Sequence, residues 1–584
     1  MPITLTRNKA LFAVILIMMA VLGRNIASQA ADLSSANLPN PDSYYKLVIL
    51  KDYTPETGFQ FIARDNAPYG SWIHWSLPHT WTIWQLHRGL MAFGVEKEAA
   101  LLWAGGGLTM LSMLLLALFL ALAVANVGSP QAAIVSALAL ASSPPLFGYG
   151  QLVQITHHIF MLVPLAAAAA CFLRREFRLS RWQDYIGGAL LGLALWISPE
   201  TMPLVLALAA MRAVIRLQHP LSGSVWPVAV GLLGILLIGW LVDPPPPTFT
   251  AWALDHISLS WLLFGGLLSC LLLHADSCVR RELPLLRSMQ EQIFALVLAA
   301  MCWLLLVPDA LSGPTGLIPD ELRVLWYGQI KELKSVEWPS EWLAYLLLPL
   351  IAAVMLGCVA WQNRSLWMLV LAVSTLIYAV LGATHIRMGA AAAFISALAF
   401  SIGLSKIRAF ISLHNSNTPL REQFLCAFLI LSLPLQVYGA MGLSYFENRG
   451  FLNEGGKESE SCNLSDALPV LNSIPFGTVL TNPNLGPELL FKTQHRIIAG
   501  NYHHNVSGLI DSFKLLRSIE PDKEAKALMK ARDISYILSC TEVLGSLRSG
   551  RNDKALSQRI AAAEIVDWLS YREVTEDWRL YLWR

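Results

Sequence analysis

Apolar runs alternate with polar connections along this chain as far as about residue 440. A short run covers residues 11–23, and longer ones are centred near residues 112, 137, 166, 192, 207, 232, 266, 298, 350, 375, 395 and 431. An α-helix needs about 20 apolar residues to cross the roughly 30 Å core of a bilayer. The pattern predicts an α-helical polytopic membrane protein with about 13 transmembrane helices in a domain spanning residues 1–440.

The first apolar run admits two interpretations. It is short for a membrane span, and Arg7 and Lys9 precede it. Ser28 and Ala30 flank Gln29 beyond its end, an arrangement that is also typical of a signal-peptide cleavage site. Under both interpretations the basic N-terminus stays in the cytoplasm and residue 42 is delivered to the outer side.

The basic residues predict the orientation of the later runs. They gather in alternate connections, which contain Arg174, Arg175, Arg178 and Arg181, then Arg212 and Arg216, then Arg280, Arg281 and Arg287, then Arg364, then Lys406, Arg408 and Arg421. The connections at 142–157, 198–202 and 243–258 contain neither Lys nor Arg. Because basic loops stay on the cytoplasmic side, we expect long outer segments at 24–98, 308–340 and 441–584.

The tail from residue 441 to 584 reads as an α/β domain outside the membrane. Strands are predicted at 476–482, 495–500 and 534–540, and amphipathic helices at 507–519 and 522–533. Cys462 and Cys540 both fall in this domain, whereas the other six of the eight cysteines lie in or beside apolar runs. An oxidising compartment would allow these two cysteines to pair.

Composition supports the membrane assignment. Hydrophobic residues make up 55% of the 584 residues and charged ones 14%, with a mean hydropathy of +0.51. Soluble domains carry about 25% charged residues, so a soluble protein is excluded. The net charge of +2 gives no sign of a nucleic-acid partner.

Polar residues that can carry chemistry cluster in the outer segments. Asp42 stands beside Tyr44 and Tyr45 soon after the first run. The stretch 70–84 reads as an amphipathic helix in the membrane interface, with His74 and its neighbours His79 and His87 near the headgroups. A solvated acid and an interfacial anchor are the alternative reading of this segment.

Further candidates stand at the outer ends of predicted helices. His157 and His158 are adjacent, and both reach one metal ion only at a frayed helix start. Glu200 occupies a very short outer turn, where a carboxylate is costly unless it is paired or faces water; it can also cap the next helix. Arg387 can either snorkel to the interface or grip a lipid phosphate with both arms of its guanidinium group.

Two later outer segments add the acid Glu332 and the paired histidines His503 and His504. Glu332 lies in a polar loop that is long enough to cover a site. No phosphate-binding Walker loop, dinucleotide fingerprint, nucleophile elbow or zinc-protease motif occurs in a usable context.

These motifs, in order along the chain, resemble those of the GT-C glycosyltransferases. The match is to oligosaccharyltransferase catalytic subunits and to a group of uncharacterised bacterial GT-C-like membrane proteins. The residues that carry it are "DSYYKL", "GSWIHWS", "QITHH", "PETMP", "GPTGLIPDELRVLWYGQIKE" and "TQHRIIAGNYHHN". Lys46, Gln154, Thr156 and His504 depart from the pattern, and the W-W-D signature that reads a protein acceptor is absent.

The resemblance implies roles for these residues. Asp42 is the expected general base or metal ligand, Arg387 the lipid-phosphate ligand, and Glu332 a second catalytic group that closes over substrate. A divalent ion, Mg²⁺ or Mn²⁺, would be held by Asp42 with His157 or His158, although Thr156 replaces an expected Asp. The expected substrate cavity contains Tyr44, Tyr45, His74, Glu200, His503 and His504.

The implied activity is sugar transfer from a polyprenyl-linked donor on the periplasmic face of a bacterial inner membrane. The donor, membrane lipids and a glycan, lipid or protein acceptor would be the partners. Two alternatives stay open: a transporter of lipid-linked sugars or small solutes, and a non-catalytic assembly scaffold with the same fold. Transporters usually show repeated halves and charged residues within the membrane, and neither is clear in this sequence.

Overall fold

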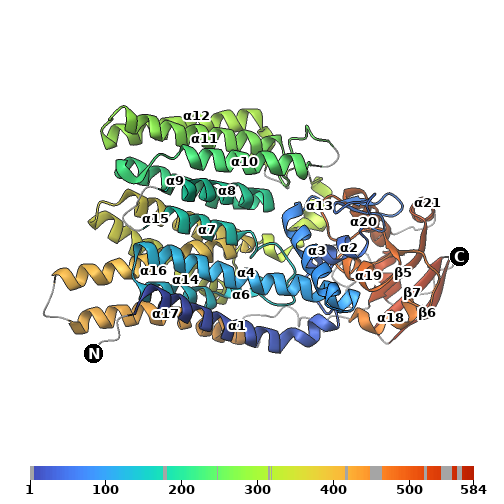
Figure 1. Cartoon of the computed structure of the whole chain (residues 1–584). Helices are drawn as coiled ribbons and strands as arrows, with labels where there is room; N and C mark the ends of the chain where they lie inside the picture. Colours follow the sequence, from blue (N-terminus) through green and yellow to red (C-terminus); the bar gives the residue numbers. More distant parts are fainter. Residues whose placement is uncertain are drawn as a thin grey trace.

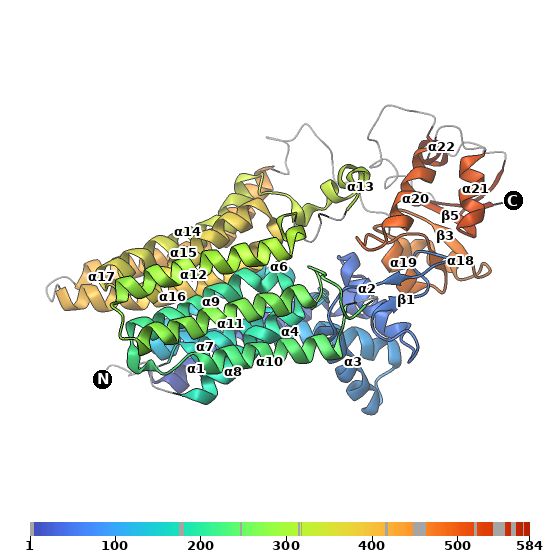
Figure 2. The ribbon, with the colours of Figure 1, turned by 90° about the horizontal axis from the view of Figure 1, so that it is seen from above.

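A bundle of long helices forms one end of the molecule, and a mixed α/β domain packs against the other end (Figure 1). The computed structural model describes residues 5–174, 180–245, 248–312, 316, 318–414, 419–447, 463–518, 523–540, 555–561, 568–575 and 577–583. The view from above shows the same two parts, with the bundle and the C-terminal domain at opposite ends (Figure 2).

Each predicted apolar run forms a helix of the bundle. These helices are α1 (Arg7–Ser34), α4 (Lys97–Val127), α5 (Pro130–Ala141), α7 (Leu162–Phe172), α8 (Arg181–Ile197), α9 (Met202–Gln218), α10 (Trp226–Val242), α11 (Leu259–Arg280), α12 (Leu285–Leu306), α14 (Pro339–Gln362), α15 (Leu366–Thr384), α16 (Gly389–His414) and α17 (Pro419–Phe446). The prediction of a polytopic helical protein is confirmed.

The helices differ in length more than the apolar pattern suggests. Within the described part of the chain, 7 helices are long and apolar enough to cross a membrane alone. By contrast, α5 has 12 residues and α7 has 11, lengths of roughly 18 and 16 Å at 1.5 Å per residue. A short helix, α6 (Pro144–Tyr149), and an irregular segment at 150–161 separate them. Pro144 and Pro145 start α6 and interrupt what reads as one apolar run.

The first helix is longer than its apolar run. It continues to Ser34, so residues 24–34 of the predicted outer segment are helical. Val14, Met18 and Leu33 are fully buried against the bundle, and the helix packs on α4 and α5. Residues 28–30, the cleavage site of the alternative interpretation, lie inside this continuous helix.

The first outer segment folds over the ends of the helices. It contains α2 (Pro41–Lys51), an antiparallel pair of short strands, β1 (Phe61–Ile62) and β2 (Ser71–Trp72), and α3 (Leu77–Ala92). The predicted amphipathic helix over 70–84 is therefore wrong in its first half, where Ser71 and Trp72 pair with β1. His79 and His87 are buried, because α3 packs on α4.

The second outer segment is held against the bundle by its backbone. It contains η4 (Pro308–Leu311), α13 (Asp320–Leu325), η5 (Tyr327–Gln329) and η6 (Lys331–Leu333). The amide of Val336 donates to the carbonyl of Ala383 at 2.9 Å, and the amide of Ile386 donates to the carbonyl of Lys334 at 3.0 Å. These bonds place η6 beside η7 (Ile386–Met388), the turn that carries Arg387.

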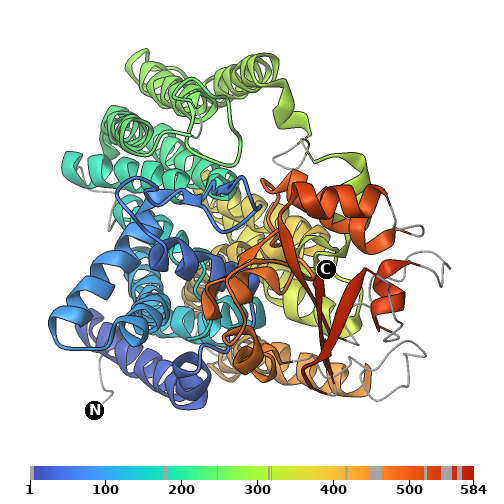
Figure 3. The same ribbon diagram turned by 90° about the vertical axis from the view of Figure 1, so that its right-hand side faces the viewer.

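The C-terminal domain contains a five-stranded mixed sheet in the order β4-β3-β5-β7-β6. Its elements are η9 (Leu464–Asp466), α18 (Leu468–Leu471), β3 (Thr478–Leu480), α19 (Gly486–Lys492), β4 (Arg496–Ile497), α20 (Val506–Arg517), α21 (Glu524–Ala531), β5 (Ile534–Cys540), α22 (Leu556–Ala561), β6 (Leu569–Glu573) and β7 (Trp578–Trp583). The three predicted strands and both predicted helices are confirmed. Seen end-on, this domain and the first outer segment lie over the helix ends (Figure 3).

The first outer segment and the C-terminal domain share backbone hydrogen bonds. The amide of Ile497 donates to the carbonyl of Arg64, and the amide of Ala67 donates to the carbonyl of Ile497, both at 2.9 Å. The Arg64 guanidinium group also reaches the carboxylate of Asp52 and the carbonyls of Leu490, Thr493 and His495. The C-terminal domain is thus docked on the first outer segment.

Candidate active site

Asp42 lies in the first turn of α2, where the local sequence starts a helix. Asn40 is the N-cap, and its side-chain oxygen accepts from the amide of Asp42 at 2.8 Å. Pro41 occupies the first helical position, which suits its fixed backbone angle. Lys46 follows Asp42 by four residues and therefore lies on the same face of the helix.

The irregular segment at 150–161 brings two histidines to this helix. The amide of Ile155 donates to the Ser43 hydroxyl at 2.9 Å, and the Asn25 side chain bonds the carbonyl of Gly150 and the amide of Leu152. These contacts hold the segment between α1 and α2.

His157, His158 and Glu200 form a compact group of metal-ligand types, since one ligand atom of each lies within 4.8 Å of the others. The rings of His157 and His158 stack at 4.7 Å. Thr156 contacts Nδ1 of His158 at 3.0 Å, whereas Nε2 of His158 is buried without a hydrogen-bond partner among the described residues. This nitrogen is therefore available to a metal ion.

The predicted metal set differs from this group in one residue. Glu200, from η2 (Pro199–Thr201), stands with the histidines where Asp42 was expected. The short turn between α8 and α9 brings its carboxylate directly to the irregular segment. Two imidazoles and a carboxylate fit a divalent ion, and imidazole is a typical ligand of transition metals, whereas Mg²⁺ favours oxygen ligands.

Arg387 connects the carboxylates of the site. Its guanidinium nitrogen Nη2 lies 2.8 Å from Oε1 of Glu200, with both side chains largely buried. Its charge also acts on Asp42 and Glu332, while Nε is buried and has no hydrogen-bond partner within the described ranges. Arg387 therefore faces the site, and one donor of its fork stays available.

Glu332 approaches from the second outer segment. The charges of Arg387, Asp42 and Glu200 act on its carboxyl group, as does the hydroxyl of Tyr149 at the end of α6. The backbone pairing of η6 with η7 accounts for this position. Asp42, Glu332 and Arg387 thus come from three separate chain segments, α2, η6 and η7, that meet at the site.

Burial dominates the electrostatics of the site. Desolvation raises the pKa of Asp42, and the charges of Arg387 and Lys46 partly oppose that rise. Desolvation also raises the pKa of Glu332 to about 7, aided by the neighbouring charges of Asp42 and Glu200. The ammonium group of Lys46, 4.2 Å from the centre of the Trp75 ring, has its pKa lowered by burial to about 7.

Tyr44 and Tyr45 are engaged within the protein rather than open to substrate. The Tyr44 hydroxyl donates to the carbonyl of Ala36 at 2.8 Å and accepts from the amide of Leu38. The Tyr45 hydroxyl donates to the carboxylate of Asp65 at 3.0 Å. Both side chains are buried, which gives them a packing role at the base of the site.

A second polar group lies beside the first. One ligand atom each of His74, Asp255, His503 and His504 lies within 4.8 Å of the others. His503 also acts on the ionisation of Asp42, which shows that the two groups are neighbours. The predicted residues His74, His503 and His504 are thus brought together, and Asp255 joins them.

Asp255, Asp65 and Tyr149 were not singled out by the sequence. Asp255 stands in a loop whose only noted feature is its lack of basic residues. Asp65 bridges Tyr45 and Asn505, so it connects the first outer segment to the C-terminal domain. Asn505 lies 440 positions from Asp65, and His503 lies 248 positions from Asp255, so no local motif marks these residues.

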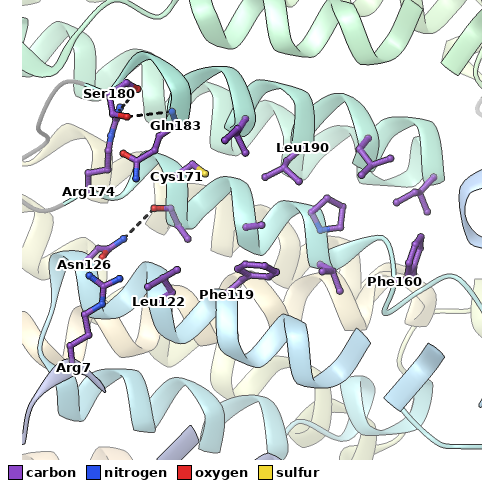
Figure 4. A pocket seen from close by; sticks show the side chains of 17 residues that line it. Arg7, Phe119, Leu122, Asn126, Phe160, Cys171, Arg174, Ser180, Gln183 and Leu190 are labelled. Atoms are coloured by element: carbon purple, nitrogen blue, oxygen red, sulfur yellow. Dashed lines mark hydrogen bonds between the residues drawn. The ribbon is translucent and has the colours of Figure 1, made fainter. Parts of the chain in front are cut away.

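A separate cavity of about 670 Å³ lies between helices of the bundle. Figure 4 shows its lining side chains, with Arg7, Asn126 and Arg174 near one end and the ring of Phe160 near the other. Most of the wall is aliphatic or aromatic and comes from α4, α7 and α8. The cavity is suited to apolar chains and contributes no carboxylate to the chemistry described above.

The architecture is that of known membrane glycosyltransferases. An Archaeoglobus fulgidus oligosaccharyltransferase tethered to an acceptor peptide with an NVT sequon matches with a TM-score of 0.63 and 14% identity, over 97% of this chain and 73% of that chain. AglB from the same organism, in complex with an inhibitory peptide and a dolichol-phosphate, matches with 0.62 and 15%, over 97% and 72%.

A third structure of the Archaeoglobus fulgidus oligosaccharyltransferase, in complex with Zn and sulfate, has a TM-score of 0.61 and 14% identity, over 96% of this chain and 71% of that chain. No protein-family model and no curated protein sequence matches. The chain is therefore a multi-pass membrane protein with the GT-C fold. At this identity, the similarity establishes the fold alone.

Proposed function

We propose that this protein is a membrane glycosyltransferase that moves a sugar or oligosaccharide from a polyprenyl-(di)phosphate-linked donor to an acceptor on the periplasmic face of a bacterial inner membrane. The observation that carries the proposal is the convergence of Asp42, Glu332 and Glu200 around Arg387, beneath the C-terminal domain. Sugar transfer needs a base for the acceptor and a counter-charge for the departing phosphate.

Asp42 is the proposed base. Its carboxylate takes the proton of the acceptor hydroxyl or amide while the acceptor atom bonds to the anomeric carbon. Burial raises its pKa, which increases its proton affinity and suits a base that works near neutral pH. Lys46, four residues away on the same helix, limits that rise.

Arg387 is the proposed ligand of the leaving group. As the bond between the anomeric carbon and the phosphate oxygen breaks, the phosphate keeps the electron pair and its negative charge grows. A guanidinium group can meet two phosphate oxygens with parallel hydrogen bonds. The free Nε donor of Arg387 supports this role, and Glu332 lies close enough to Arg387 to respond to its charge.

His157, His158 and Glu200 would hold a divalent ion, and such an ion would add positive charge near the phosphate. Dolichol-phosphate bound to AglB is consistent with a lipid-phosphate donor for this chain. The acceptor stays open, since the sequence lacks the signature with which protein acceptors are read.

The test uses the purified chain in nanodiscs with sugars linked to polyprenyl mono- or diphosphate. Released polyprenyl (di)phosphate is measured by mass spectrometry. Asp42→Asn keeps the shape of the side chain and should lower the release rate by about 10²- to 10⁴-fold. The exposed acid Asp32, at the outer end of α1, supplies the matched control Asp32→Asn, which should retain the rate.

Equal rates for Asp42→Asn and the unmodified protein would exclude Asp42 as the base. Movement of intact donor across the bilayer without cleavage would favour a transporter. Absence of release with every donor, for a protein that still binds donor lipid, would favour the scaffold alternative.

A further inference from the structure

The group formed by His74, Asp255, His503 and His504 contains neither the proposed base nor the proposed phosphate ligand, although the sequence predicts three of its members in the substrate cavity. Its members come from three chain segments: the first outer segment, the loop between α10 and α11, and the turn before α20. One ligand atom from each of three imidazoles and one carboxylate lies within 4.8 Å of the others. We propose that this group is a Zn²⁺ site that joins the C-terminal domain to the first outer segment and to the loop between α10 and α11.

Asp255 lies at the centre of the group. Its Oδ2 atom is 3.0 Å from Nε2 of His503 and 2.7 Å from Nε2 of His504. In a tetrahedral zinc site with Zn–N and Zn–O bonds of about 2.0–2.2 Å, the ligand atoms lie about 3.3–3.5 Å apart. Small side-chain movements therefore suffice to admit the ion among these three atoms.

Adjacent histidines rarely reach one ion from a regular helix, because their side chains point about 100° apart. Here residues 501–505 form a turn that ends at Asn505, the N-cap of α20. The rings of His503 and His504 lie 4.5 Å apart as a result. The turn thus presents two imidazoles on one side.

His74 completes the group from the first outer segment. Its ring lies 4.5 Å from that of His503 and 5.4 Å from that of His504. The Tyr502 hydroxyl contacts both the backbone amide and Nδ1 of His74, so Nε2 is the nitrogen available to an ion. Outer hydrogen bonds of this kind orient the histidine ligands of metals.

The loop that carries Asp255 is also held in place. Asp243 accepts from the amide of Leu77 at 2.7 Å, from Nε1 of Trp196 at 2.9 Å and from Nε2 of Gln60 at 2.8 Å. The ring of His256, next to Asp255, stands 3.4 Å from the same carboxylate. These bonds fix the loop against the segment that presents His74.

The donor set matches zinc better than magnesium or calcium, since imidazole nitrogen suits zinc, magnesium and calcium favour oxygen, and four ligands complete a tetrahedral zinc site. His504 is exposed, whereas the other three side chains are partly buried, which leaves an entry path from solvent. A closed four-ligand site has a structural function, because it offers no open position for substrate.

The test measures metal content rather than activity. The full chain, purified in nanodiscs with a tag that contains no histidine and then dialysed against a weak chelator, is analysed for zinc by mass spectrometry. Zn K-edge absorption should show nitrogen and oxygen ligands at about 2.0–2.1 Å with imidazole scattering. We expect about one tightly bound zinc ion per chain at this site.

Asp255→Ala and His504→Ala should each weaken zinc binding by more than about tenfold, because loss of even an outer partner of a zinc ligand costs about 10- to 100-fold. The melting temperature of the unmodified protein should fall on zinc removal, and that of the two variants should not respond. His219→Gln, an exposed histidine in the connection between α9 and α10, is the matched control and should keep its zinc.

Two results would overturn the proposal: a protein supplied with zinc that holds none after dialysis, or a zinc content that both variants leave unchanged. In the second case the ion belongs to another group, such as His157, His158 and Glu200. Neither result depends on whether the protein transfers sugars.

Discussion

Glu332 allows a quantitative test of the site's electrostatics that needs no substrate. Its pKa rises from an ordinary value of 4.5 to about 7, chiefly because the carboxyl group is buried. Each tenfold change in the ionisation equilibrium corresponds to about 1.4 kcal/mol. Ionising Glu332 in the folded protein therefore costs about 3 kcal/mol more than ionising it in the unfolded chain.

The direction of the effect follows from proton binding. Between pH 4.5 and about 7 the folded protein binds the Glu332 proton and the unfolded chain has lost it. The free energy of unfolding therefore falls as pH rises through this window, and the contribution is gone above it. Glu332→Gln cannot ionise and keeps an oxygen for the Tyr149 hydroxyl, so it should be more stable than the unmodified protein above about pH 7.

The assay is thermal unfolding in nanodiscs, followed by tryptophan fluorescence at about pH 5 and about pH 8.5. We expect a melting temperature that differs by a few degrees at the higher pH and little at the lower. Glu321→Gln removes an exposed acid from the same outer segment and should follow the unmodified protein. Parallel curves for Glu332→Gln and the unmodified protein would show that Glu332 ionises as it does in water, and the argument from burial would fail.

Three further changes probe other parts of the molecule. Arg387→Lys keeps the charge but loses the guanidinium fork; donor release should fall by about 100-fold, and an unchanged rate would remove the phosphate-ligand role. Asp184→Ala leaves the fully buried Arg212 without its 2.9 Å partner and should cost about 3–5 kcal/mol, read as a lower melting temperature; an unchanged one contradicts this. Cys540 is buried and disulfide-bonded, and Cys462 lies outside the described residues. Neither cysteine should react with maleimide until a reductant is added. Labelling of either one without reductant would refute their pairing.

Apolar runs predicted the bundle well, because a helix that crosses a bilayer must be apolar over most of its length. They could not predict that α5 and α7 are short, because apolar residues such as Ile155, Ile159 and Phe160 also occur in the irregular segment between them. Strand-like and helix-like periodicity likewise predicted β3 and β5 as strands and α20 as a helix in the C-terminal domain. The stretch at 70–84 misled the prediction, because aromatic and polar residues mixed in this way suit both a membrane interface and a folded outer segment.

Residues of the candidate site could be predicted where placing their charge in or near the membrane is energetically unfavourable. Glu200 and Arg387 stand out because charges at helix ends in a membrane are expensive unless they are used or paired, and the structure pairs them at 2.8 Å. Asp255 carries no such mark in its loop. Only the folded chain brings it to His503, 248 positions away, so no spacing rule could have found it.

The charges at the site explain why a cation suits it. Asp42, Glu200 and Glu332 oppose Arg387 and Lys46, so full ionisation gives three negative charges against two positive ones and a net charge of −1. A lipid phosphate would add further negative charge and raise the pKa of Asp42 again, which would hold a proton on the proposed base. Positive charge beside His157 and His158 would lower that pKa and let the phosphate and an ionised Asp42 coexist. A cation held by the metal-ligand group next to Arg387 would therefore allow the proposed proton transfer to Asp42, which the acidic residues and the phosphate alone would oppose.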